Sequence, residues 1–276
     1  MSALLGPAEI RDLADALELQ PTKKLGQNFV VDGNTVRKIV RIASLAPGEH
    51  AVEVGPGLGS LTLGLLEAGC RVTAIEIDRR LAEQLPRTVE AMQPGAPLEV
   101  IAADALRVDG VPGEPTALVA NLPYNVSVPV LLHLLEVVPS LTSALVMVQA
   151  EVGHRLAAAP GSRVYGSPSV KAAWYGDWSI AGTISRQVFW PVPNVDSVLV
   201  RFRREDPPGT DAERRAVFVL VDAAFGQRRK MLRQSLAEVL GGSAAASATL
   251  EAAGVDPTAR GEQLAVADFL RVARAR

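Results

Sequence analysis

Five short apolar runs alternate with segments of helical pattern between about residues 35 and 150, and this order limits the folds that the chain can adopt. Apolar runs of this length suit strands that are buried on both faces. Strands separated by helices form a parallel sheet covered by helices on both sides. The sequence therefore predicts an α/β fold. The expected strands are residues 51–54, 72–77, 98–103, 117–120 and 144–148, and helices are expected at 60–68 and 79–92.

Two further strands are expected at residues 180–188 and 195–203. The sequence WPVP lies between them and no helix separates them, so we expect an antiparallel hairpin at one end of the sheet. After residue 204 the stretch EDPPGTDAE is typical of a linker, and the chain beyond it is rich in alanine and helical in pattern. We therefore divide the chain into a sheet domain, residues 1–205, and a small C-terminal all-α domain, residues 206–276.

The composition indicates a globular protein without a strong net charge. Hydrophobic residues make up 48% of the chain, and 28 Lys and Arg against 30 Asp and Glu leave a net charge of −2. The total charge therefore does not identify a nucleic-acid partner. The single cysteine, Cys70, allows no internal disulfide. The opening MSALLGPAEIRD lacks the pattern of a signal peptide, and no apolar run approaches the roughly 18 residues of a membrane span. We expect a soluble cytoplasmic protein.

The sequence VEVGPGLGS indicates a strand that enters a glycine-rich turn and then a helix. Gly55, Gly57 and Gly59 lack a Cβ atom, so a ligand can lie against the main chain there. Glu76 ends the next strand, 21 residues after Gly55, and an acidic residue at about this distance can bind a ribose hydroxyl. The spacing G-x-G-x-G departs from the dinucleotide pattern, which argues against a nicotinamide. The turn and Glu76 suit the adenosine part of a ligand, although the glycines alone also suit a packing turn.

Two polar residues close the following strands. Asp104 comes after the third strand, where it is placed to accept a hydrogen bond from an adenine amino group or to cap a helix N-terminus. Asn121 ends the fourth strand. The carboxyl ends of parallel strands lie at one edge of a sheet, so we expect the glycine turn, Glu76, Asp104 and Asn121 to meet there. This layout resembles that of Rossmann-like class I S-adenosylmethionine-dependent methyltransferases.

The motif Asn121-Leu122-Pro123-Tyr124 resembles the N/D-P-P-Y motif of methyltransferases that modify the exocyclic nitrogen of a base. The lone pair of that nitrogen is delocalised into the ring. If the side-chain oxygen of Asn121 and the backbone carbonyl of Leu122 accept its N–H bonds, the nitrogen becomes more tetrahedral and its lone pair points at the methyl carbon. Pro123 stiffens the turn, Tyr124 offers a face for stacking the base, and Phe189 closes on the base from the other side or belongs to the core. The alternative for the motif is a turn that begins a helix.

Seven segments occur in the order seen in the KsgA-type ribosomal RNA adenine N6-dimethyltransferases, and the chain resembles this family. They are KKLGQNFVVD, VEVGPGLGSLT, IEID, the Asp104 site, NLPYNVS, VQAEVGHRL and VFWPVPNVDS. The resemblance spans about residues 20–205 and continues more loosely through FGQRRKMLRQSL. It implies a monomer that transfers two methyl groups to each of two adjacent adenines near the 3′ end of small-subunit (16S) ribosomal RNA during subunit assembly. The methyl donor would be S-adenosylmethionine, without a metal.

The resemblance also implies roles for individual residues. Gly55 would pack against the methionine part of the donor, Glu76 would bind its ribose and Asp104 its adenine. The full set expected to contact the donor is Asn28, the backbone of Val30, Gly55, Glu76, Asp104 and Asn121, of which Asn121 also borders the target. Val30 stands where the family usually has leucine, a change that a backbone contact survives, and Trp190 in the F-x-P-x-P turn is a second departure.

Two basic stretches are candidates for contact with RNA phosphates. Residues 21–41 contain five basic residues and one acidic residue, a charge of +4, and the sequence GQRRKMLR contains no acidic residue. On a helix Arg229, Lys230 and Arg233 share one face. The alternative is a solvated helix face. The candidate RNA-binding residues are Lys23, Lys24, Arg228, Arg229, Lys230 and Arg233. The three histidines show no metal-binding spacing.

Two other functions remain open. An adenine methyltransferase for large-subunit RNA, of the antibiotic-resistance type, would use the same chemistry. A non-enzymatic ribosome assembly factor would keep the RNA-binding surface, but it would have no need of Glu76, Asp104 and Asn121 together. A DNA adenine methyltransferase fits less well, because residues 23–32 and the helical tail resemble the ribosomal family.

Overall fold

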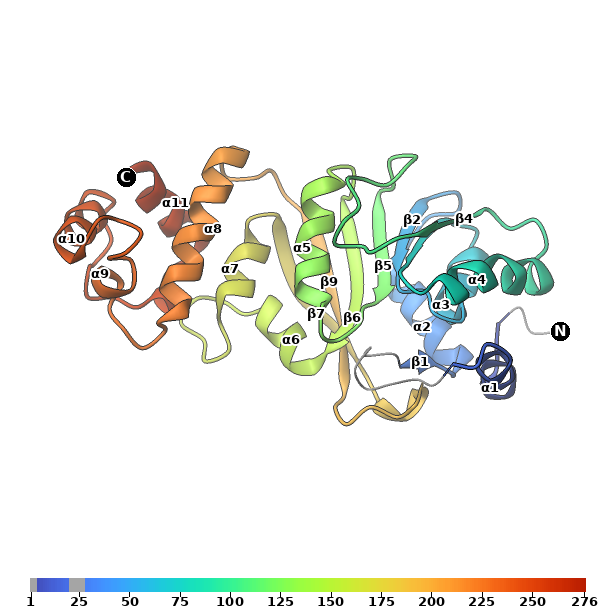
Figure 1. Cartoon of the computed structure of the whole chain (residues 1–276). Helices are drawn as coiled ribbons and strands as arrows, with labels where there is room; N and C mark the ends of the chain where they lie inside the picture. Colours follow the sequence, from blue (N-terminus) through green and yellow to red (C-terminus); the bar gives the residue numbers. More distant parts are fainter. Residues whose placement is uncertain (1–3, 20–27) are drawn as a thin grey trace. The chain divides into compact units, whose positions relative to one another are not determined.

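The computed structural model describes residues 4–19 and 28–276, which divide into two compact units (Figure 1). Unit 1 consists of the residues up to 153 together with 179–203, and unit 2 consists of 154–178 together with 204–276. The sequence analysis placed residues 154–178 in the first domain. In the structure this stretch groups with the C-terminal helices, because the rings of Trp174 and Tyr175 contact the ring of Phe218 edge-on.

A seven-stranded sheet forms the centre of unit 1. Its strands are β2 (His50–Val54), β3 (Arg71–Glu76), β4 (Leu98–Ala102), β5 (Ala117–Asn121), β6 (Ser143–Gln149), β7 (Gly176–Ile184) and β9 (Ser197–Arg204). They are arranged in the order β4-β3-β2-β5-β6-β9-β7. The first five in this order are parallel, and β9 runs antiparallel to β6. The five strands predicted between residues 35 and 150 are confirmed.

Burial differs between the centre and the edge of this sheet. Every residue of β2 is buried, and β5 is buried up to Asn121. The edge strand β4 is partly exposed along its length. The expectation that all five strands are buried on both faces is therefore wrong for β4, which has a neighbouring strand on one side only.

Helices of unit 1 begin close to where the sequence predicted them. The helices predicted at 60–68 and 79–92 correspond to α3 and α4, and both pack against β3. Asp32 caps α2, since its carboxylate accepts the backbone N–H groups of Asn34 and Thr35. The helices are α1 (Pro7–Ala16), α2 (Gly33–Ala43), α3 (Ser60–Glu67), α4 (Arg79–Met92), α5 (Ser127–Val137) and α6 (Ala150–Leu156).

β7 and β9 are neighbouring strands at one end of the sheet, where the sequence predicted a hairpin, but the segment that connects them differs from the expected turn. β7 ends at Ile184, and a 3-10 turn (Arg186–Val188) follows it. Phe189–Trp190 then form β8, which pairs antiparallel with β1 (Phe29–Val30) in a separate two-stranded sheet. The rings of Phe29 and Trp190 stack with their centroids 6.3 Å apart. The end of the first expected strand is thus a 3-10 turn instead, and the two residues after it pair with β1, about 160 residues earlier in the chain.

Unit 2 contains α7 (Ser167–Ala173), α8 (Asp211–Gly226), α9 (Leu232–Ser235), α10 (Ser243–Ala252) and α11 (Val266–Arg274). Thr210 caps α8, because its hydroxyl accepts the N–H of Glu213 while the Glu213 carboxylate accepts the N–H of Thr210. α8 ends at Gly226, and the N–H of Lys230 donates to Gln227 O at 2.8 Å in a turn. The expectation that Arg229, Lys230 and Arg233 share one helix face is therefore wrong. No helix within the described ranges is long and apolar enough to cross a membrane.

Candidate active site

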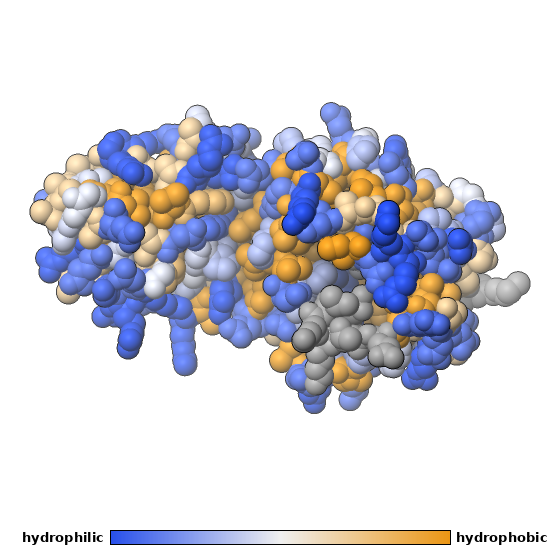
Figure 2. Space-filling model, viewed as in Figure 1, coloured by the Kyte–Doolittle hydropathy of each residue, from blue (hydrophilic) through white to orange (hydrophobic). Residues whose placement is uncertain are grey.

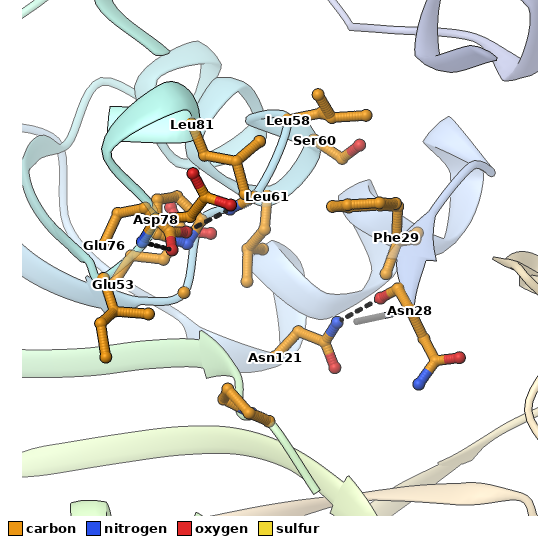
Figure 3. A pocket seen from close by; sticks show the side chains of 16 residues that line it. Asn28, Phe29, Glu53, Leu58, Ser60, Leu61, Glu76, Asp78, Leu81 and Asn121 are labelled. Carbon is orange, nitrogen blue, oxygen red and sulfur yellow. Dashed lines mark hydrogen bonds between the residues drawn. The ribbon is translucent and has the colours of Figure 1, made fainter. Parts of the chain in front are cut away.

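A pocket of about 330 Å³ lies at the carboxyl ends of β2, β3 and β5 (Figure 3). Its lining comes from the segment around β1, the glycine-rich turn after β2, the end of β3 and the end of β5. Five residues expected to contact a methyl donor line this pocket: Asn28, Val30, Gly55, Glu76 and Asn121. Its volume falls within the range of small-molecule sites, about 300–1,000 Å³.

The glycine-rich turn brings the main chain close to the ring of Phe29. Gly57 has a φ of 59°, in the left-handed region. A Cβ atom at this position would lie 2.8 Å from a ring carbon of Phe29. Gly59, with a φ of 98°, is the N-cap residue directly before α3. The turn therefore requires glycine at Gly57 for both conformation and space.

Glu76 is held by the backbone of two neighbouring segments. Its side chain is buried, and its Oε2 accepts the N–H of Gly57 at 3.2 Å while its Oε1 accepts the N–H of Asp78 at 3.0 Å. Burial raises the pKa of Glu76, and the two backbone N–H groups oppose that rise. The carboxyl is thus fixed at the base of the turn by backbone N–H groups, and a carboxylate has lone-pair capacity for one further hydrogen bond beside them.

Asn121 points across the pocket opening from the end of β5 (Figure 3). Its Nδ2 donates to the backbone oxygen of Asn28 at 3.0 Å. This bond sets the plane of the amide and directs Oδ1 away from Asn28, as Figure 3 shows. The side chain of Leu122 is buried, and the backbone N–H of Leu122 donates to the backbone oxygen of Met147 at 3.1 Å. The turn after β5 is therefore anchored on both sides.

The rest of the motif is divided between the pocket and β9. Pro123 lines the pocket. The Tyr124 hydroxyl is 2.7 Å from Ser197 Oγ, with either oxygen able to donate, and burial raises the pKa of Tyr124. Ser197, the first residue of β9, is fully buried. The Tyr124 ring is thus positioned by a buried hydroxyl.

Four residues expected at the site lie elsewhere in the structure or outside its described part. Asp104 does not line the pocket; its Oδ1 accepts the N–H of Leu106 at 2.9 Å in a turn. No helix begins at this turn, so the alternative role of Asp104 as a helix cap is wrong. Phe189 is 2% exposed, belongs to the core of unit 1 and does not line the pocket. Lys23 and Lys24 lie outside the described residues. The proposed roles of these four residues stay predictions.

The structure adds three polar lining residues that the sequence reasoning did not assign to the site, Glu53, Ser60 and Asp78. Glu53, in the centre of the unit 1 sheet, lines the pocket and is 1% exposed. Burial raises its pKa to about 8. Ser60, at the start of α3, also lines the pocket, and its buried Oγ has no hydrogen-bond partner within the described chain. The sequence feature that could have identified Glu53 is its charge inside an otherwise apolar strand, directly before the glycine turn.

The basic residues that were expected to bind RNA in unit 2 differ in the contacts that they make within the protein. Arg228 is already engaged, since its Nε lies 2.8 Å from Glu262 Oε2 and its guanidinium also donates to Arg163 O. Arg229 and Lys230 are exposed. Figure 2 shows hydrophilic side chains projecting from the surface near the C-terminal end of α8. Of the expected phosphate contacts in this stretch, Arg229 and Lys230 are the best placed.

In the part of the chain that the structure describes, no group of three or more His, Cys, Asp or Glu side chains is placed to hold a metal ion. The 23S rRNA methyltransferase ErmE has a similar structure, with a TM-score of 0.65 and 28% identity over 90% of this chain and 99% of that chain. A dimethyladenosine transferase from Plasmodium falciparum has a TM-score of 0.71 over 87% of this chain and 94% of its own, and at 22% identity it shows the fold alone.

Sequence comparisons identify the family. Ribosomal RNA small subunit methyltransferase A of Leifsonia xyli is 68% identical over 98% of this chain and 98% of its own length. The protein of the same name from Streptomyces coelicolor is 60% identical over 98% of this chain and 96% of its own. Residues 19–275 match the model of the ribosomal RNA adenine dimethylase family. The fold is that of a class I S-adenosylmethionine-dependent methyltransferase, and the chain belongs to the ribosomal RNA adenine dimethylase family.

Proposed function

We propose that the protein dimethylates two adjacent adenines near the 3′ end of small-subunit ribosomal RNA, with S-adenosylmethionine as the methyl donor. Family membership supports the reaction type, and the names of the high-identity relatives support the small subunit as the target. The observation that carries the assignment of the site is the amide of Asn121, oriented by Asn28 at the opening of a pocket built for a small ligand.

The pocket suits a positively charged adenosine derivative. Its ionisable lining side chains, as far as the structure describes them, are the carboxyls of Glu53, Glu76 and Asp78. Glu76 can accept a ribose hydroxyl while keeping both of its backbone N–H bonds. The unpartnered Ser60 hydroxyl is available to the polar end of the donor. When bound, the donor supplies an electrophilic methyl carbon on a sulfonium.

The acceptor side depends on two oxygen atoms of the motif. Asn121 Oδ1 and the carbonyl oxygen of Leu122 would each accept one N–H of the adenine amino group. Two acceptors on one side of the nitrogen turn its lone pair toward the methyl carbon. The lone pair forms the new N–C bond as the C–S bond breaks, and the displaced N–H proton leaves to solvent. The rate gain then comes from holding the two reactants in line.

Tyr124 would support the adenine ring by stacking. Its ring position is set by the hydrogen bond to Ser197, so the base-binding face depends on β9 as well as on the motif. This arrangement supports an adenine held between the turn after β5 and the start of β9.

Unit 2 would provide phosphate contacts to the assembling small subunit. The exposed Arg229 and Lys230 support this part of the proposal. We also propose that the protein acts as a monomer in the cytoplasm, where small subunits assemble.

The test compares wild-type protein with Asn121→Ala on small subunits that lack the dimethyladenines. Labelled methyl groups should appear as N6,N6-dimethyladenine with the wild type, and Asn121→Ala should lower the rate by about 100-fold or more, the scale reported for loss of one transition-state hydrogen bond. Asn34→Ala is the matched control, because Asn34 is exposed and does not line the pocket. A parallel assay offers large-subunit RNA, and label that appears only there would favour the antibiotic-resistance type of target. Full activity of Asn121→Ala would reject the assignment of the site.

A further inference from the structure

Glu53 is a buried acid that the proposed reaction leaves without a role. It is 1% exposed and lines the pocket near Glu76 (Figure 3). Thr62 Oγ1 donates to Glu53 Oε2 at 2.6 Å. Within the described chain no Lys or Arg forms an ion pair with Glu53. A buried carboxylate without a cation is strongly unfavourable, so the neutral acid is the stable form when no cation is near.

The groups that face Glu53 reinforce this state. On the β3 side lie Glu76 and, beyond it, Asp78, and both are carboxyls; the charge of Glu76 opposes ionisation of Glu53. On the α3 side lies the hydroxyl of Thr62, whose bond favours ionisation. On the other side, β5 has the sequence ALVAN and carries no ionisable side chain. Arg80 is occupied by Asp78, with a distance of 2.8 Å between Nη2 and Oδ2. The ionisable side chains that a cation meets in the described lining of this pocket are therefore all carboxyls.

We propose that Glu53 holds a proton until the methyl donor binds and then releases it to solvent, so that the Glu53 carboxylate becomes the counter-charge of the donor's sulfonium. The step is balanced: one O–H bond breaks, one proton goes to water, and a carboxylate remains beside a cation. The product of methyl transfer is a neutral thioether, so Glu53 would stay protonated beside it. Glu53 would therefore make the pocket prefer charged donor over spent product. This inference rests on the proposed function, because it needs the donor in this pocket.

The size of the effect follows from the proton equilibrium. Burial places the pKa of Glu53 at about 8 without a ligand, and an opposite charge within about 4–6 Å lowers a carboxyl pKa by about 1–3 units. With a fall of about two units, donor binding at pH 6.5 would release about 0.7 proton. Donor affinity would then rise about fivefold from pH 6 to pH 7. Product affinity would not share this rise.

Isothermal titration calorimetry of the full chain at pH 6.5, in two buffers of different ionisation enthalpy, measures the protons released on binding. The probes are S-adenosylmethionine and S-adenosylhomocysteine, which carry the same amino acid end, so the difference between them removes any proton taken from that end. We expect the donor to release about 0.7 proton more than the product. Equal release with both ligands would overturn the inference.

Two variants assign the proton. Glu53→Gln keeps the shape of the neutral acid but cannot ionise, so it should bind the product as the wild type does at pH 6 and show no excess proton release with the donor. Thr62→Val removes the donor that favours ionisation, so its donor affinity should rise with pH over a higher pH range than in the wild type. An excess release that persists in Glu53→Gln would overturn the inference. If the wild type binds neither ligand, the proposed function itself fails, and this outcome is distinct from binding without proton release.

Discussion

Replacing Glu53 by glutamine should stabilise the folded protein, and the gain should grow as pH rises. Burial raises the pKa of Glu53 from 4.5 to about 8. Between these two values the folded chain keeps a proton that the unfolded chain has lost, so the folded state loses stability as pH increases. From pH 5 to pH 8 this one carboxyl would remove about 3.5 kcal/mol of unfolding free energy from the wild type. Glutamine does not titrate, so the variant should escape that loss.

Urea unfolding at pH 5 and pH 8 measures the effect, with no ligand present. The difference in unfolding free energy between variant and wild type isolates Glu53, because every other titrating group is common to both chains. This difference should increase by about 3.5 kcal/mol from pH 5 to pH 8. As a surface control, Glu83→Gln on the exposed side of α4 should change the unfolding free energy by less than about 0.5 kcal/mol at either pH. A difference for Glu53→Gln that is the same at both pH values would show that Glu53 is ionised in the folded chain, contrary to the reasoning above.

Three further variants test separate parts of the structure. Gly57 has a left-handed backbone conformation, and Gly57→Ala places a methyl group 2.8 Å from the ring of Phe29. Donor affinity measured by calorimetry should therefore fall about tenfold or more, as expected for strain of about 1–3 kcal/mol. Unchanged affinity would mean that the turn adapts freely. Ser197→Ala removes the hydrogen-bond partner of the Tyr124 hydroxyl. The KM for the small subunit should rise several-fold while the Kd of the donor stays constant. An equal rise in both constants would instead indicate a general loss of structure. Exchange of Arg229 and Lys230 for alanine should lower the slope of log affinity for RNA against log salt by about 1.5, and an unaltered slope would remove both residues from the RNA contact.

The periodic features of the fold could be predicted from the sequence. The parallel strands and the rim residues Gly55, Glu76 and Asn121 follow from apolar runs that end in glycine or polar residues, since the geometry of a parallel sheet brings those ends together. Asp104 shows the limit of this reasoning, because a residue that ends a strand can turn its side chain into a local bond with Leu106 instead of into the pocket.

Other features depend on contacts that local pattern does not contain. The diversion of Phe189 and Trp190 to β1 requires a pairing across about 160 residues. The break between α8 and α9 depends on the turn closed by Lys230 and Gln227, although the basic run looks suitable for a continuous helix. The protonation of Glu53 depends on how deeply the strand is covered, and a single charged letter within an apolar run does not reveal that depth.

The small β1–β8 ribbon links both sides of the acceptor site. Both connections leave the ribbon at the end where Phe29 pairs with Trp190. On the β1 strand this end carries Asn28, whose carbonyl orients the amide of Asn121, and on the β8 strand it leads through the proline-rich turn to Ser197, which orients Tyr124. A change in the Phe29–Trp190 stack would therefore shift the amide and the aromatic ring at the same time. A substitution in this stack should therefore weaken both the binding of the adenine amino group and the stacking of the base. Combined with a substitution of Asn121, it should lower the methylation rate by less than the product of the two separate effects.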